Sequence, residues 1–313
     1  MSNLQTDFSV DLKSSGKSQV KSTQSPGEIV FNVINYTFFA ILSLIMLYPF
    51  WHQVMMAFSS SSMAAAGGSF LWPKDFTVST MQRVITSQSI QSGFRVSLFV
   101  TVSGTLLGTL ITAMIAYPLS KLTLRGNGIF MFLIVFTMLF NGGMIPTYLL
   151  VRSLKLIDTL GALILPNVVG AFNIIIMRSF FAALPPSLEE SAKIDGANDI
   201  MVFFRIILPL SMATIATIAL FTAVMYWNDF FSTVIYITTS RNKWSMQAEL
   251  RFLIMNTSQA MRDIGVEVTT AENINENSVR AASIVVTTVP ILVVYPFLQR
   301  YFVKGVMIGS IKG

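Results

Sequence analysis

The side chains that carry out acid-base or nucleophilic chemistry are few in this sequence and do not gather. Its 313 residues include a single histidine, His52, and no cysteine. Neither an imidazole cluster nor a thiolate metal site can therefore form. An integral membrane enzyme would need convergent histidine, cysteine or carboxylate groups, and the carboxylates here are scattered. We expect no catalytic residue and no metal site, which leaves an enzyme as a poorly supported alternative.

One fragment, Gly16-Lys17-Ser18, resembles the end of a phosphate-binding loop. That loop requires a glycine five positions before Gly16, and this chain has Asp11 at that place. We therefore expect no cofactor in this chain. Any use of ATP and Mg must belong to a partner protein.

A second group of side chains could contact a polar solute, because amides and carboxylates hydrogen-bond to hydroxyl groups and aromatic rings cover C–H faces. The candidates for a substrate path are Asn141, Asn167, Asn173, Tyr226, Trp227, Asn228 and Asp229. A buried asparagine in a span more often joins helices than binds a ligand. A tryptophan near the membrane interface more often belongs to the aromatic belt at the lipid headgroups than to a ligand site. Trp227, Asn228 and Asp229 are thus also consistent with a structural corner at the outer end of an apolar run, residues 206–227.

The elements that must position these side chains are apolar runs. Hydrophobic residues make up 53% of the chain and charged residues 12%, with a mean hydropathy of +0.65, whereas a soluble domain carries roughly a quarter charged residues. The runs are continuous, unlike the alternating strands of a membrane β-barrel. Helices need about 20 apolar residues to cross a bilayer. The sequence predicts an all-α integral membrane protein with six spans, at about residues 30–51, 96–119, 129–150, 160–184, 206–227 and 282–301.

The loops indicate how the spans are oriented. Lys121 and Arg125 lie in the short connection 120–127, which the positive-inside rule places in the cytoplasm. An even number of spans then puts both termini in the cytoplasm, and the long loop 228–280 outside. Residues 1–27 hold too little apolar surface to become ordered, so we expect a disordered cytoplasmic tail ahead of a membrane domain at 28–313. The net charge of +6 is spread over the loops, which argues against a nucleic-acid partner.

A charged segment, residues 185–209, interrupts the apolar runs. Its two leading prolines stop the preceding helix, and Ser187 with Glu190 matches a capping box, so a helix is expected from Leu188. Gly196 can take the left-handed conformation that ends this helix. The sequence predicts a short helix, a tight bend and a second helix at the cytoplasmic surface.

The second helix can be capped by Asn198 or Asp199 and leads into the fifth span. Two interpretations of the hairpin remain open. Its small residues at the bend, with apolar side chains as anchors, suit insertion into a groove of a partner. An interfacial helix pair that covers the membrane bundle has the same sequence features.

The segment resembles the EAA loop of bacterial ABC importer permeases. That pattern reads Glu-Ala-Ala, three residues, Gly, nine residues, Ile-x-Leu-Pro. The matching residues are Glu190, Ser191, Ala192, Gly196, Ile206, Leu208 and Pro209. Ser191 departs from the pattern, which usually has alanine there, and serine is small enough to fit the same groove.

Further stretches look like the carbohydrate branch of this family, similar to the smaller membrane subunit of the maltose transporter. They are FNGGMIPTYLL from Phe140, YWNDFF from Tyr226 and YFVKGVMIGSIKG from Tyr301. Within the branch, NGGMIPTYLLVRSLKLIDT is most similar to permeases for complex oligosaccharides, including alginate and pectin-derived ones. The resemblance covers residues 27–313 and implies a MetI-like bundle of six transmembrane helices with a cytoplasmic coupling helix-turn-helix.

The resemblance also implies partners in a bacterial cytoplasmic membrane. They are a second, related permease, an ATPase dimer that binds ATP and Mg, an extracytoplasmic solute-binding lipoprotein, an oligosaccharide substrate and membrane lipid. The residues that would couple to the ATPase are Glu190, Ser191, Ala192, Asp195, Gly196, Ile206, Leu208 and Pro209. A permease for peptides, amino acids or phosphate remains an alternative, as does a scaffold that only anchors a soluble partner.

Overall fold

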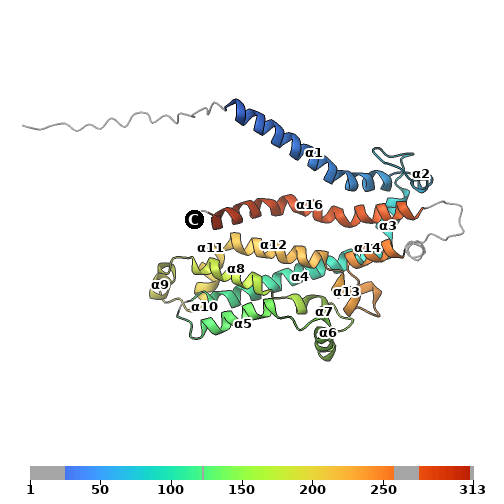
Figure 1. Cartoon of the computed structure of the whole chain (residues 1–313). Coiled ribbons are helices and arrows are strands. Elements are labelled where there is room, and N and C mark those ends of the chain that lie inside the picture. The colour runs from blue at the N-terminus through green and yellow to red at the C-terminus, as the bar shows by residue number, and fades with distance from the viewer. Residues whose placement is uncertain (1–24, 122, 257–274, 311–313) are drawn as a thin grey trace, which may run out of the picture. The chain divides into compact units, whose positions relative to one another are not determined.

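The computed structural model of the chain describes residues 25–121, 123–256 and 275–310. The regular elements in these ranges are helices, without a strand among them (Figure 1). The chain divides into two compact units, Met1–Phe50 and Trp51–Gly313. The predicted disordered tail lies almost entirely outside the described residues. The prediction of an all-α chain is confirmed.

The first helix, α1, runs over Pro26–Ala57 and contains the first predicted span. It begins with a capping box. The amide of Ser25 donates to Oε2 of Glu28 at 3.0 Å, and the amide of Glu28 donates to Oγ of Ser25 at 3.3 Å. Pro26 follows the cap, where its fixed φ suits the first helical turn and its missing N–H costs nothing.

The second predicted span is one long helix, α4, Gln88–Leu119. Its 32 residues extend over about 48 Å. It packs along α12, Met212–Asn228, and α8, Ala171–Ala182. α4 and α12 approach each other closely because a glycine lies where they meet. A Cβ at Gly104 would lie 2.5 Å from the ring of Tyr226.

Gly108, one turn further along α4, is under a stricter constraint. A Cβ there would lie 2.5 Å from the carbonyl oxygen of Val168, a backbone atom that cannot rotate away. We expect Gly108→Ala to lower the free energy of unfolding by about 1–3 kcal/mol, the usual cost of overpacking. Thermal unfolding of the purified protein in detergent measures it. Gly128→Ala is the matched control, because no atom lies within 4 Å of a Cβ at Gly128; equal midpoints for the two variants would contradict the constraint.

Three of the predicted spans are bent helix pairs. α5, Asn127–Leu139, and α6, Met144–Ser153, are bent by 112°. Gly161–Asn167 and α8 are bent by 54°, and Asp199–Leu210 and α12 by 81°. By length and composition, two of the described helices could cross a membrane, or five if each bent pair is one span. The sixth predicted span lies within α16, Glu276–Ser310.

Residues that disfavour a continuous helix lie at or near these breaks. Between α5 and α6, Gly143 has a φ of +88°, which side chains other than glycine rarely adopt. Pro166 lies in the 3₁₀ turn η1, Leu165–Asn167, which follows α7, Gly161–Ile164. Because proline lacks an N–H, it interrupts the hydrogen bonds of a continuous helix.

The end of the second unit that lies opposite α9 and α10 carries several short helices (Figure 1). They are α2, Ser61–Ala66, α3, Ser79–Thr86, α13, Phe231–Tyr236, the 3₁₀ turn η3, Arg241–Lys243, and α14, Met246–Met255. The last three belong to the predicted outer loop 228–280, of which residues 257–274 lie outside the described residues.

An ion pair whose carboxylate is buried joins η3 to α14. Glu249 is fully buried, and Arg241 donates to its carboxylate through Nε at 3.3 Å and Nη2 at 3.1 Å. The guanidinium also lies over the ring of Phe252, 3.9 Å from its centroid. These hydrogen bonds compensate the carboxylate for the water it has lost, and the face of Phe252 stabilises the guanidinium.

Candidate coupling hairpin and substrate path

The predicted hairpin is present. α9 runs over Ser187–Ile194 and α10 over Asp199–Val202. Gly196 lies between them with a φ of +87°, the left-handed conformation expected at a helix end. Oδ1 of Asn198 accepts from the amide of Met201 at 2.8 Å, so Asn198 is the cap of the second helix.

The predicted capping box at the start of the hairpin is wrong. α9 begins at Ser187 itself, and Pro186 precedes it as the N-cap without a side-chain hydrogen bond. The carbonyl of Pro186 accepts the amides of Glu189 and Glu190 at 3.0 and 3.1 Å. Proline already has a helical φ, here −58°, which moves the helix start one residue earlier than the serine pattern indicates. Both glutamates stay in the first turn.

The hairpin turns one face to the bundle and another outward. Ala192, expected at the bend facing a partner, is instead buried among the chain's own residues, beside Val202 and Phe203 in one hydrophobic cluster. Ile194 and Ile200 are 86% and 70% exposed. Glu190, Ser191, Asp195 and Gly196 are also exposed. The outward face therefore combines apolar tips with polar side chains.

The residues that connect the hairpin to α12 form an irregular segment. A π-helical turn, η2, covers Phe203–Ile207, and α11, Leu208–Leu210, follows. Ile206 and Leu208 pack against the same cluster as Ala192, whereas Pro209 is exposed. Pro209 cannot donate to the carbonyl four residues before it, which accounts for the irregular turn. These residues thus lie before the 81° bend into α12 and not within one straight span.

Two candidates for the substrate path are buried. The hydroxyl of Tyr226 donates to the carbonyl of Ile164 at 2.8 Å, and the side chain is 2% exposed. Trp227 is 8% exposed and meets the ring of Phe94 edge-on at 6.2 Å. Tyr226 is therefore committed to joining α12 to α7.

The next two candidates form a corner after α12. Nδ2 of Asn228 donates to the carbonyl of Val224 at 2.9 Å. Oδ1 of Asp229 accepts from the amide of Ser232 at 3.1 Å, near the start of α13. Both side chains are used in local turns, which agrees with the structural alternative.

The remaining three candidates lie at helix breaks or at a helix interface. Oδ1 of Asn141 accepts from the amide of Gly143 at 2.9 Å in the break before α6. Asn167 is exposed at the end of η1. Nδ2 of Asn173 lies 3.5 Å from Oγ1 of Thr222 between α8 and α12. Among the described residues, no hydrogen bond joins one of these three to another.

The structure also contains functional candidates that the sequence does not reveal. Asp158 has a φ of +59°, and its carboxylate accepts from the amides of Thr239 at 2.9 Å and Ser240 at 3.3 Å. These hydrogen bonds, the one from Thr239 foremost, hold the pKa of Asp158 below its usual value. Lys121 and Glu189, 68 positions apart, form an ion pair. Neither contact follows from periodicity or from a motif.

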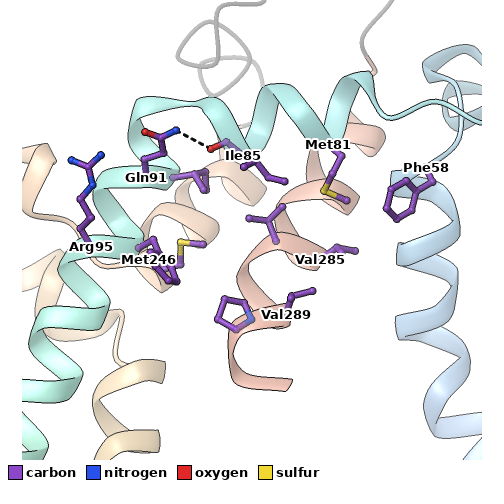
Figure 2. A pocket seen from close by; sticks show the side chains of 12 residues that line it. Phe58, Met81, Ile85, Gln91, Arg95, Met246, Val285 and Val289 are labelled. Carbon is purple, nitrogen blue, oxygen red and sulfur yellow. Dashed lines mark hydrogen bonds between the residues drawn. The ribbon is translucent and has the colours of Figure 1, made fainter. Parts of the chain in front are cut away.

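An apolar cavity of about 580 Å³ lies between α3, α4, α14 and α16 (Figure 2). Met81, Met246 and Val285 turn toward it. The amide of Gln91, one of its few polar groups, already donates to the carbonyl of Ile85 at 3.4 Å. A sugar needs several free polar partners, so this cavity is a poor site for one. In the ranges that the structure describes, no cluster of three His, Asp or Glu side chains could hold a metal.

The second unit is thus a helical bundle in which a short charged hairpin connects, through η2 and α11, to the apolar helix α12, the arrangement that the resemblance to a membrane transport subunit predicts. The chain belongs to the family of binding-protein-dependent transport system inner membrane components, whose model matches residues 108–308. It is thus a permease subunit of an ABC importer in the cytoplasmic membrane, as the resemblance of its EAA loop predicts.

Individual relatives match over almost their whole length. The chain is 43% identical to the polygalacturonan/rhamnogalacturonan transport system permease YtcP of Bacillus subtilis over 91% of this chain and 99% of the relative. It is 44% identical to the protein LplC of the same organism over 91% and 95%. A solved bacterial ABC transporter involved in the import of the acidic polysaccharide alginate matches with a TM-score of 0.82 at 32% identity, over 89% of this chain and 99% of that chain.

Proposed function

We propose that this chain is one permease subunit of an ATP-driven importer for oligosaccharides that carry uronate groups. The observation that carries the proposal is the 43% identity to YtcP over nearly the full length of both chains. The solved relative is involved in the import of alginate, an acidic polysaccharide. The relatives above that are named for a substrate are named for sugars, which leaves a peptide, amino acid or phosphate cargo without support.

The hairpin of α9 and α10 is the proposed docking element for the ATPase dimer, which binds ATP and Mg. Exposed apolar side chains grouped with polar ones mark contact surfaces, and Ile194 and Ile200 fit that description. Glu190, Ser191 and Asp195 supply polar contacts beside them. Ala192 instead fixes the hairpin to the bundle.

Coupling would follow from continuity of the chain. Ile206, Leu208 and Pro209 connect the docked hairpin to α12. Closure of the ATPase dimer displaces the hairpin, and the packed segment passes the displacement to α12 as a rigid-body movement. The 81° bend between Asp199–Leu210 and α12 turns a shift along the membrane surface into a rocking of the span.

The remaining partners are a second, related permease and an extracytoplasmic solute-binding protein. Both termini lie in the cytoplasm in this proposal. Support comes from Lys121, which lies in the basic connection 120–127 and contacts Glu189, so the positive loop and the hairpin share one side. Asn141, Asn167 and Asn173 stay as proposed contacts along the substrate path.

Purification of the protein from its native membrane in mild detergent tests the assignment of partners. We expect an ATPase, a second permease and a sugar-binding protein to co-purify, and oligogalacturonides to stimulate ATP hydrolysis by the complex. Recovery of the protein alone, even after cross-linking at the hairpin, would contradict the proposed docking element. Stimulation by neutral maltooligosaccharides in place of oligogalacturonides would contradict the uronate cargo.

A further inference from the structure

The coupling hairpin has a second attachment besides its continuity with α12. Lys121, just after α4, forms an ion pair with Glu189 in the first turn of α9. The two side chains are 29% and 16% exposed, so water and salt screen the pair less than a fully exposed one. The Lys121 ammonium also lies over the ring of Tyr117, 4.4 Å from its centroid.

A second ion pair in this region lies entirely within the hairpin. Lys193 and Asp199 meet at 2.8 Å with side chains 53% and 73% exposed. They tie α9 to α10, both parts of the hairpin, and exposed pairs of this kind contribute little. Among the ion pairs of the described residues, Lys121–Glu189 is the one that leaves the hairpin and reaches α4.

Hydrogen bonds to neighbouring residues fix the C-terminal end of α4, so a displacement of the hairpin can be transmitted to this helix. Nε of Arg178 in α8 donates to the carbonyl of Leu119 at 2.8 Å. Nδ2 of Asn127 donates to the same carbonyl at 3.1 Å and to that of Lys121 at 3.0 Å. These bonds satisfy carbonyls at a helix C-terminus, where positive groups are favourable.

A cavity of about 550 Å³ lies directly beside the ion pair. Its lining includes Tyr117, Lys121, Glu189, Phe203 and Phe204. Side chains therefore do not fill the space between the α4 end and the hairpin on this side, and the ion pair bridges it. Burial lowers the pKa of Lys121, with the positive charge of Lys193 adding to the effect and Asp199 opposing it.

Toward its N-terminal end, α4 contacts α14. The amide of Met246 at the start of α14 donates to Oγ of Ser97 at 2.8 Å, and both residues are buried. α4 thus connects the hairpin end of the unit to the end that carries α13 and α14 (Figure 1).

We propose that Lys121 and Glu189 are positioning residues that fasten the coupling hairpin to α4. A displacement of the hairpin then moves α4 and, through the hydrogen bond between Ser97 and Met246, α14, in parallel with the movement of α12. This inference rests on the proposed function of the hairpin. It adds a route of coupling that is independent of the EAA residues.

The test uses the assembled transporter in proteoliposomes, with labelled trigalacturonate as the probe. Lys121→Met keeps the length of the side chain and removes its charge, and Glu189→Gln removes the opposite charge. We expect each to lower the sugar moved per ATP hydrolysed about fivefold or more, the usual size of coupling between sites. Lys121→Arg and the exchange Lys121→Glu/Glu189→Lys should restore it. Arg125→Met, an exposed charge of the same loop, is the matched control and should change nothing.

Hydrogen exchange in the assembled complex is a readout that does not depend on the cargo. Loss of either charge should speed exchange of the α9 amides, and the charge exchange should reverse this. A normal ratio of sugar to ATP in Lys121→Met, or a charge exchange no better than the single variants in both measurements, would overturn the proposal. If the unchanged protein fails to move trigalacturonate, the proposed cargo is wrong, and hydrogen exchange still decides on the attachment.

Discussion

Gly196→Val is expected to reduce uptake about tenfold or more while the protein stays in the membrane. Gly196 has a φ of +87°, and an L-residue in the left-handed region costs about 1–2 kcal/mol, with β-branched residues worst. The substitution therefore opposes the bend that presents the outward face of the hairpin. Uptake into proteoliposomes and retention of the ATPase during purification measure the effect.

Gly196→Asn separates backbone conformation from side-chain size. Nothing lies within 4 Å of a Cβ at Gly196, so there is room for the Cβ of either side chain, and asparagine tolerates the left-handed conformation. We expect the asparagine variant to keep most of its uptake. Normal uptake and normal ATPase retention in the valine variant would contradict the role of the bend.

Arg241→Leu is expected to have the largest effect on stability. It removes guanidinium hydrogen bonds from the fully buried carboxylate of Glu249. Breaking a fully buried ion pair from one side costs about 3–5 kcal/mol, and we expect the lower end of this range because the Arg241 side chain is 36% exposed. The midpoint of thermal unfolding in detergent should fall accordingly.

The double variant Arg241→Leu/Glu249→Leu provides the control for this interpretation. It removes both charges, so that no buried carboxylate loses its guanidinium partner, and it should be more stable than Arg241→Leu alone. A double variant that is less stable than the single one would show that the pair contributes through packing and not through charge compensation.

The hairpin shows which structural features the sequence predicts and which it does not. Gly196 predicts the bend correctly, and Asn198 is the cap among the two candidates that the sequence offers, because each residue acts on the backbone within a few positions. The first cap is wrong because Ser187 and Pro186 compete for the helix start and proline already has the helical φ. The inward position of Ala192 depends on packing against Val202 and Phe203, which a local pattern does not contain.

The membrane spans likewise combine features that the sequence predicts with features that depend on tertiary packing. Hydropathy identifies the apolar runs, but an average over 20 residues does not register a single residue such as Gly143, which lies in the break between α5 and α6. The sequence offers Tyr226 as a candidate for the substrate path, and only the structure shows that its hydroxyl donates to the carbonyl of Ile164, 62 positions away. The pair of Lys121 and Glu189 likewise depends on two helices meeting in space.

The most direct test of the central claim is ATP-dependent uptake of labelled trigalacturonate by proteoliposomes that contain this chain with its co-purified permease, ATPase and binding protein. We predict uptake that requires ATP and the binding protein, and that unlabelled oligogalacturonides inhibit but maltotriose does not. Uptake that maltotriose inhibits equally, or no uptake of trigalacturonate alongside ATP-driven uptake of a non-sugar solute, would contradict the account.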